Sequence, residues 1–105
     1  MKVVITGGTG NLGSKLAAHL LSSEPGQWSV HIIEHPDFYQ EAAVPDGATV
    51  TLGDVGDTDA LATPGSWCDA LDGADALVHF SAVNPYPNAD WAECGETMDH
   101  TVRFT

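Results

Sequence analysis

The sequence predicts an α/β fold in which a parallel sheet carries flanking helices. Short apolar segments alternate with helix-like segments along the 105 residues, and this alternation is typical of parallel strands joined by right-handed crossovers. A chain of this length forms at most one small domain. Its hydrophobic fraction of 43% is ordinary for a globular protein.

The first strand and the first helix enclose a glycine-rich turn. An apolar strand is expected at Lys2–Thr6, and the spacing of leucines predicts a helix from Asn11 to Ser22. Gly7 and Gly10 lie between them and Gly13 lies in the first turn of the helix, so that glycine recurs at every third position. The chain therefore begins with a strand, a glycine turn and a helix.

Each glycine of this turn has an expected purpose. Gly7 allows a tight turn, Gly10 leaves space for a phosphate near the backbone, and Gly13 lets the helix approach the strand. Asn11 and Leu12 then lie in the first helical turn, whose unpaired N–H groups favour an anion. We expect these five residues to bind the pyrophosphate of a dinucleotide. The alternative is an ordinary strand–helix turn.

The remaining elements follow from apolar runs and from the Pro and Gly residues that bound them. They are a strand at Ser29–Glu34, a loop at 35–47 with a helical turn at Phe38–Ala43, a strand at Ala48–Leu52, short helices at Asp57–Leu61 and Ser66–Leu71, a strand at Ala76–Ser81, a proline-rich loop at Asn84–Asn88 and a helix at Asp90–Arg103. The predicted strand order is 3-2-1-4, a partial Rossmann-like sheet. Such sheets bind ligands at the carboxyl ends of their strands.

Two further motifs follow the glycine turn. Gly53-Asp54-Val55-Gly56-Asp57 follows the third strand, and the run from Gly73 to Ala82 (GADALVHFSA) covers the fourth. Together with the T-G-x-x-G-x-x-G turn, they resemble the extended short-chain dehydrogenase/reductase family, which includes nucleotide-sugar epimerases and dehydratases. The resemblance covers nearly the whole chain, with Phe80 and Ser81 departing from the family pattern. It implies an NAD-dependent epimerase, dehydratase or oxidoreductase that transfers hydride.

The acid at the end of the second strand bears on the choice of cofactor. A carboxylate at Glu34 can accept hydrogen bonds from the adenine ribose and would repel a 2′-phosphate. His35 occupies a position where NADP-binding relatives often have arginine, and Asp37 adds negative charge. NAD is therefore favoured over NADP. The alternative for Glu34 is a surface acid that merely ends a strand.

The resemblance also implies roles for the other strand ends. Asp54 would bond the adenine amino group and Val55 would lie against the ring, although Asp54 also suits an ordinary turn. Phe80, Ser81 and Ala82 complete the expected cofactor site. Ser81 is expected either to contact a ribose or only to satisfy the end of its strand.

Composition limits the other partners. Fifteen acidic residues against three basic ones give a formal charge of −12, which disfavours nucleic acid and anionic lipid. No apolar run approaches the roughly 20 residues that span a bilayer, and no signal peptide is evident. Cys68 and Cys94 are expected to be free thiols of a cytoplasmic protein. The remaining expected partners are the dinucleotide and a small-molecule substrate.

One motif is expected to be misleading. His31-Ile32-Ile33-Glu34-His35 spells the H-x-x-E-H pattern of zinc proteases, which requires a helix. In a strand the two histidines would lie ~13 Å apart, too far to share one ion. We therefore expect no metal site.

No catalytic residue is assigned. The resembled family uses a Tyr-x-x-x-Lys pair for acid–base chemistry, but Ala43 and Asp90 occupy the lysine position after Tyr39 and Tyr86. We interpret residues 1–105 as the N-terminal NAD(P)-binding portion of a longer enzyme, truncated before its catalytic and substrate-binding part. The alternatives are a non-catalytic NAD(P)-sensing module and an inactive fragment. The fourth strand would then form an exposed sheet edge, for which self-association is expected.

Overall fold

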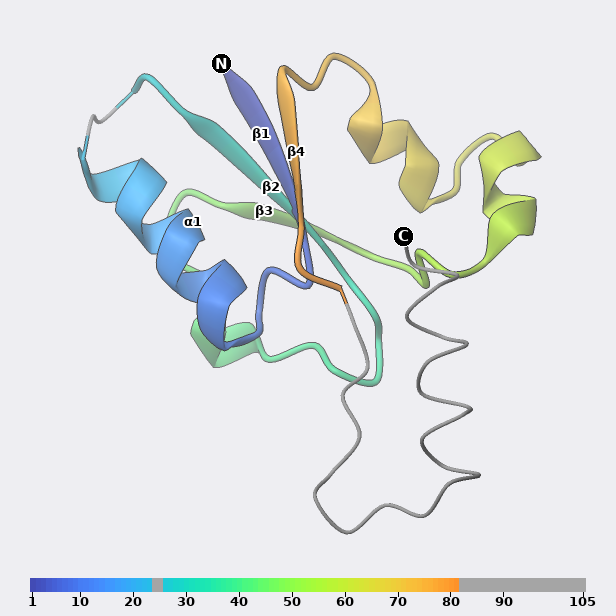
Figure 1. The fold of residues 1–105 in the computed structure, drawn as a ribbon, viewed down its shortest axis with the longest axis horizontal. Helices are drawn as coiled ribbons and strands as arrows, with labels where there is room; N and C mark the ends of the chain where they lie inside the picture. The colour runs from blue at the N-terminus through green and yellow to red at the C-terminus, as the bar shows by residue number, and fades with distance from the viewer. Residues whose placement is uncertain (24–25, 82–105) are drawn as a thin grey trace, which may run out of the picture.

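The described part of the chain is built on one parallel sheet. The computed structural model describes residues 1–23 and 26–81. Its elements are β1 (Lys2–Thr6), α1 (Asn11–Ser23), β2 (Ser29–Glu34), η1 (Glu41–Ala43), β3 (Thr49–Leu52), η2 (Thr58–Ala62), η3 (Trp67–Leu71) and β4 (Ala76–His79), where η denotes a 3-10 helix. The strand order is β3-β2-β1-β4, as predicted (Figure 1).

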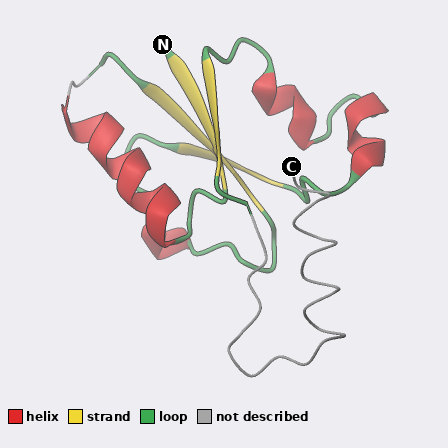
Figure 2. Cartoon of the chain, viewed as in Figure 1, coloured by secondary structure: helices red, strands yellow, loops and turns green. Residues whose placement is uncertain are grey.

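The central position of β1 explains why its three middle residues, Val3, Val4 and Ile5, are all apolar rather than alternating with polar ones. Within β1, Val3 pairs with Val30 of β2 on one side and with Ala76 of β4 on the other. Figure 2 shows α1 on one side of the sheet and η2 and η3 on the other. Because both faces of β1 are covered, Val4 and Ile5 are fully buried. None of the described helices is long and apolar enough to cross a membrane.

The core forms between α1 and the sheet. Ala17 of α1 is fully buried against a cluster that includes Val3, Ile5, Val30 and Ile32. Partly buried leucines of the same helix pack around this cluster. Leu16, Leu20 and Leu21 of the pattern that predicted the helix therefore lie on its packed face, whereas Leu12 is exposed.

The end of β4 differs from the prediction. The strand was expected to reach Ser81 but ends at His79, the residue that pairs with Thr6 at the end of β1. Phe80 N still donates to Thr6 O at 3.1 Å, but beyond Thr6 the chain turns at Gly7 and offers no further strand partner. Similarly, β3 begins one residue later than predicted, at Thr49.

The short helices are 3-10 helices whose predicted first residues are caps. Asp57 accepts a hydrogen bond from Asp59 N before η2, and Ser66 accepts one from Cys68 N before η3. The helical turn expected within 38–43 is η1. The proline-rich loop at 84–88 and the helix expected at 90–103 lie outside the described residues.

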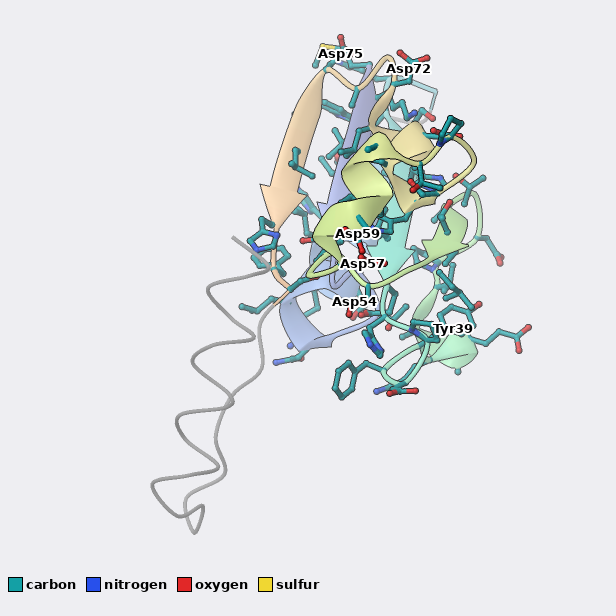
Figure 3. The ribbon with its side chains drawn as sticks, turned by 90° about the vertical axis from the view of Figure 1, so that its right-hand side faces the viewer. Tyr39, Asp54, Asp57, Asp59, Asp72 and Asp75 are labelled. Atoms are coloured by element: carbon teal, nitrogen blue, oxygen red, sulfur yellow. The ribbon has the colours of Figure 1, made fainter. Side chains whose placement is uncertain are left out.

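Lys2 ties β4 to the start of β1. Its Nζ donates to Ala70 O at 2.7 Å and to Asp72 O at 2.9 Å, while its backbone N donates to Asp75 Oδ2 at 2.7 Å. Figure 3 shows Asp72 and Asp75 at one end of the sheet, and Asp54 and Tyr39 towards the other. One of the three basic residues thus holds the sheet together at the end away from the strand carboxyl termini.

His31 lies in a strand, as predicted, with both ring nitrogens hydrogen-bonded. One contacts Thr49 Oγ1 and the other lies 2.8 Å from Thr51 Oγ1. Burial, and to a lesser extent the charge of Lys2, lower the pKa of His31 from its usual 6.5. The unfolded chain therefore binds this proton more readily than the folded chain.

We predict that His31 makes stability depend on pH. Because the folded-state pKa is the lower one, its contribution is complete above about pH 6.5 and is lost as the pH falls through the folded-state pKa. Urea unfolding of the wild type, His31→Gln and the exposed control His19→Gln at about pH 7.5 and about pH 5.5 measures this. The loss of stability on acidification should be smaller in His31→Gln than in the other two. Equal losses in all three proteins would refute the prediction.

Candidate functional site

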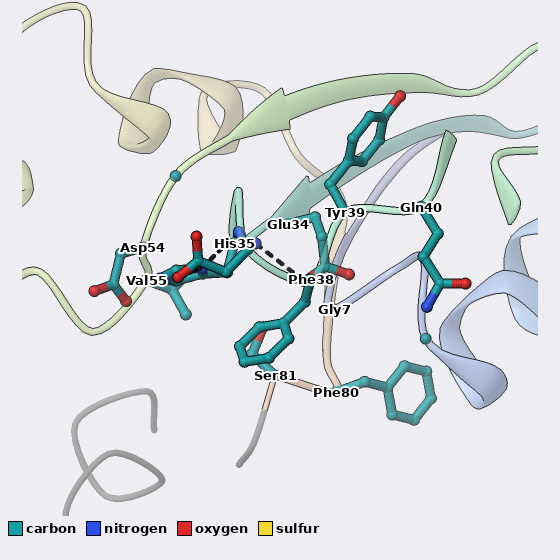
Figure 4. Close-up of a pocket in the computed structure, with 13 residues that line it drawn as sticks. Gly7, Glu34, His35, Phe38, Tyr39, Gln40, Asp54, Val55, Phe80 and Ser81 are labelled. Carbon is teal, nitrogen blue, oxygen red and sulfur yellow. Dashed lines mark hydrogen bonds and ion pairs between the residues drawn. The ribbon is translucent and has the colours of Figure 1, made fainter. Parts of the chain in front are cut away.

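A pocket of about 380 Å³ opens at the carboxyl ends of the strands (Figure 4). Backbone hydrogen bonds hold these ends together, from Gly7 N to Ile33 O and from Gly53 N to Glu34 O, each at 2.9 Å. The lining residues come from the glycine turn, the end of β2 and its following loop, the segment after β3 and the segment after β4. They are Gly7, Gly10, Glu34, His35, Asp37, Phe38, Tyr39, Gln40, Gly53, Asp54, Val55, Phe80 and Ser81.

The structure brings most of the predicted site residues together in this pocket. Those that line it are Gly7, Gly10, Glu34, Asp54, Val55, Phe80 and Ser81. Asn11 and Leu12 do not line it but are exposed in the first turn of α1, next to the glycine turn. Gly13 is buried beneath that turn. Ala82 lies outside the described residues.

The three spaced glycines serve different steric purposes. Gly7 has a φ of +68°, and a Cβ on it would lie 3.0 Å from Ser81 N. A Cβ on Gly13 would lie 2.5 Å from Gly7 O and 2.7 Å from Gly8 Cα. A Cβ on Gly10 would meet only Gly7 O, at 3.3 Å. Gly7 and Gly13 therefore shape the turn, whereas Gly10 chiefly leaves space beside the pocket.

Glu34 is a buried acid with a defined orientation. Its side chain accepts hydrogen bonds from Thr9 N at 3.1 Å and Thr9 Oγ1 at 2.7 Å, both through Oε2, and from His35 N at 3.0 Å through Oε1. Only 6% of Glu34 is exposed. Glu34 is therefore not the surface acid that the sequence left open. Thr9 was not among the predicted site residues, although it is the one buried polar side chain within the glycine turn.

The loop after β2 also contributes residues that were not predicted. Phe38, Tyr39 and Gln40 line the pocket. The loop is ordered around His35, whose Nδ1 accepts a hydrogen bond from Asp37 N at 3.0 Å and whose ring lies 5.3 Å from that of Phe38. The available sequence signal was the pair of aromatic residues, Phe38 and Tyr39, directly after Asp37. The loop has no periodicity that would have distinguished them.

Asp54 forms the turn that was its alternative interpretation, and it also lies at the pocket. Its Oδ1 accepts a hydrogen bond from Gly56 N at 2.8 Å, which is a turn-forming contact. The same residue and Val55 line the pocket. Behind them, a Cβ on Gly53 would lie 2.6 Å from the Trp67 side chain, so η3 packs directly against this segment.

Thr6 connects the ends of β1 and β4. Its Oγ1 lies 2.7 Å from His79 Nδ1 and accepts a hydrogen bond from Ser81 N at 3.3 Å. Ser81 is therefore held beside the pocket through its backbone. His79 has a hydrogen-bond partner but is exposed, because β4 lies at the edge of the described sheet.

The sheet order, the glycine turn that leads into α1 and the position of the pocket define a Rossmann-like α/β protein. Residues of both motifs beyond the turn also line this pocket, namely Asp54 and Val55 after β3 and Phe80 and Ser81 after β4. The chain belongs to the NAD dependent epimerase/dehydratase family, whose family model matches residues 3–105.

Solved structures extend the comparison. The Bordetella bronchiseptica enzyme WbmG in complex with NAD is 32% identical, with a TM-score of 0.64 over 92% of this chain and 29% of that one. A UDP-glucose 4-epimerase is 21% identical, with a TM-score of 0.76 over 99% of this chain and 29% of that one. The UDP-N-acetylglucosamine 4-epimerase from Methanobrevibacter ruminantium M1 is 22% identical, with a TM-score of 0.67 over 98% of this chain and 32% of that one.

The two less identical structures show a shared fold. This chain spans only 29% to 32% of the length of these three proteins. The sequence has no significant match among curated proteins.

Proposed function

We propose that this chain is the NAD-binding portion of an NAD-dependent epimerase or dehydratase. The observation that carries the proposal is the single pocket in which the glycine turn, Glu34, the Asp54–Val55 pair and Ser81 meet. Support comes from the family membership and from the WbmG enzyme. That enzyme is 32% identical to this chain, and its structure was solved in complex with NAD.

The residues present suit the parts of a dinucleotide. The open space at Gly10, next to the start of α1, suits a pyrophosphate, because the first helical N–H groups have no partner within the helix. Glu34 would accept a hydrogen bond from a ribose hydroxyl, and Asp54 and Val55 would contact the adenine. Ser81 would lie on the nicotinamide side. Bound NAD would supply a hydride acceptor for the oxidation of a substrate hydroxyl.

The proposed substrate is a sugar nucleotide or a related small hydroxyl or carbonyl compound. WbmG has also been solved with NAD and UDP, and the Methanobrevibacter epimerase with UDP-N-acetylmuramic acid. The sequence has no Tyr-x-x-x-Lys pair, since Ala43 and Asp90 occupy the lysine position after its two tyrosines. We therefore propose that the chain by itself binds NAD without turning over a sugar nucleotide.

Calorimetric titration with NAD and with NADP tests the cofactor assignment. We expect one NAD per chain and weaker binding of NADP, because a 2′-phosphate would approach the negative charge of Glu34. No binding of NAD by the folded chain would refute the proposed function. Tighter binding of NADP would refute the role of Glu34 alone. A parallel assay for epimerisation of UDP-glucose should detect no turnover, and turnover would show that the chain is active by itself.

We also propose that β4 mediates self-association. Among the described residues β4 pairs only with β1, and Leu77 on it is 54% exposed. The formal charge of −12 opposes association, so raising the salt concentration should increase the dimer fraction by screening this repulsion. Light scattering at high micromolar concentration, with and without about 0.5 M NaCl, measures this. A monomer under both conditions would refute the proposal.

A further inference from the structure

The Glu34 carboxylate has one acceptor position left for a ligand. A carboxylate offers about four lone-pair sites on its two oxygens. Thr9 N and Thr9 Oγ1 occupy Oε2, and His35 N takes one site on Oε1. Because Glu34 is only 6% exposed and also lines the pocket, its remaining acceptor site on Oε1 is the one available to a bound molecule.

Thr9 donates two of the three hydrogen bonds that hold this carboxylate. Its side-chain Oγ1 lies 2.7 Å from Glu34 Oε2 and 3.3 Å from Phe38 O, and it also accepts a hydrogen bond from Gln40 N at 3.4 Å. A hydroxyl has one hydrogen to donate, and the shorter, charge-assisted contact is to the carboxylate. Thr9 is 2% exposed, so water does not replace these contacts.

Among the described residues, no lysine or arginine lies where it could pair with a 2′-phosphate beside Glu34. The described residues that line the pocket include Glu34 and Asp37 but no lysine or arginine. Lys2 lies at the opposite end of β1, and Lys15 is exposed on α1. A 2′-phosphate would fit only if the Glu34 carboxylate rotated away, and its contacts with Thr9 oppose that rotation.

We infer that Thr9 is a positioning residue for nucleotide specificity, which holds Glu34 so that a 2′-hydroxyl is accepted and a 2′-phosphate is rejected. The inference rests on the proposed function and adds a residue that does not itself contact the ribose. It predicts that loss of the Thr9 hydroxyl narrows the preference for NAD over NADP. If the role of Thr9 were purely structural, loss of its hydroxyl would weaken the binding of NAD and of NADP equally.

The test compares Thr9→Val, which keeps the shape but lacks the hydroxyl, with Thr9→Ser, which keeps the hydroxyl. Ser22→Ala is a matched hydroxyl deletion at the far end of α1, where the exposed Ser22 donates from Oγ to His19 O at 3.3 Å. Calorimetry with NAD and NADP, combined with thermal unfolding, gives both affinities and stability. We expect the ratio of the two affinities to fall about tenfold in Thr9→Val and to stay unchanged in Thr9→Ser and Ser22→Ala.

The outcomes separate this inference from the proposed function. If the wild type binds NAD and Thr9→Val keeps the wild-type ratio, the Thr9 inference is overturned while the proposed function stands. If the folded wild type binds no NAD, the proposed function itself fails and the inference fails with it. Should Thr9→Val not fold, the same ratio is measured in Thr9→Ala, where an unchanged ratio overturns the inference and a fall of about tenfold supports it.

Discussion

Replacement of Gly10 by alanine is expected to weaken NAD binding about a hundredfold while leaving the chain folded. The added methyl group would meet only Gly7 O, at 3.3 Å, which a small shift of the turn can relieve. It would, however, occupy the space beside the start of α1 where the pyrophosphate is proposed to lie. A hundredfold loss corresponds to about 2.7 kcal/mol, the scale of losing close backbone contacts with a charged group.

Calorimetry with NAD and thermal unfolding by circular dichroism measure the two effects of Gly10→Ala separately. The midpoint Tm should fall by no more than a few degrees, because about 1 kcal/mol shifts Tm by about 4–8 °C in a domain of this size. Ala18→Gly, an exposed change on α1, is the control for a general loosening of the helix. Wild-type affinity for NAD in Gly10→Ala would place the pyrophosphate elsewhere.

Replacement of Gly13 by alanine should have the opposite profile, a large loss of stability. Its Cβ would lie 2.5 Å from Gly7 O and 2.7 Å from Gly8 Cα, and both are backbone atoms of the turn. Overpacking of this kind costs about 1–3 kcal/mol, which exceeds the gain of less than about 1 kcal/mol in helix propensity. We expect Tm to fall by about 10 °C.

Urea and thermal unfolding of Gly13→Ala beside Gly10→Ala give the sharpest comparison, because the two changes add the same methyl group to the same turn. A Gly13→Ala protein as stable as Gly10→Ala would contradict the close packing of α1 on the turn. The pair therefore separates the glycine that shapes the fold from the glycine that leaves space for a ligand.

The sequence predicted those parts of the fold that local signals define. β1 and β2 have the predicted bounds because each is a short, mainly apolar segment with Gly7 or Pro36 close after its end. The strand order followed from the alternation of elements and from the family resemblance. The prediction that β4 ends at Ser81 was wrong. The length of this strand is set by its register with Thr6 and by the turn at Gly7, which are properties of the folded sheet.

The same distinction applies to the site. Glu34 and Asp54 could be placed at strand ends from sequence alone, because parallel strands bring their carboxyl ends to one edge. The hydrogen bonds from Thr9 to Glu34 could not be predicted from the sequence, because they join the turn after β1 to the end of β2. Gly8 is a second example, since a Cβ there would lie 2.6 Å from the Ile32 side chain, and nothing in the local sequence indicates that contact.

An NMR titration of the 15N-labelled chain tests most directly whether this pocket holds NAD. On addition of NAD, the backbone amide signals of Gly10, Asp54, Val55 and Ser81 should shift, because these residues line the pocket. The amide of Leu77, exposed on β4 away from the pocket, should not move. Shifts confined to residues outside the pocket, or no shifts at millimolar NAD, would contradict the binding of NAD in this pocket.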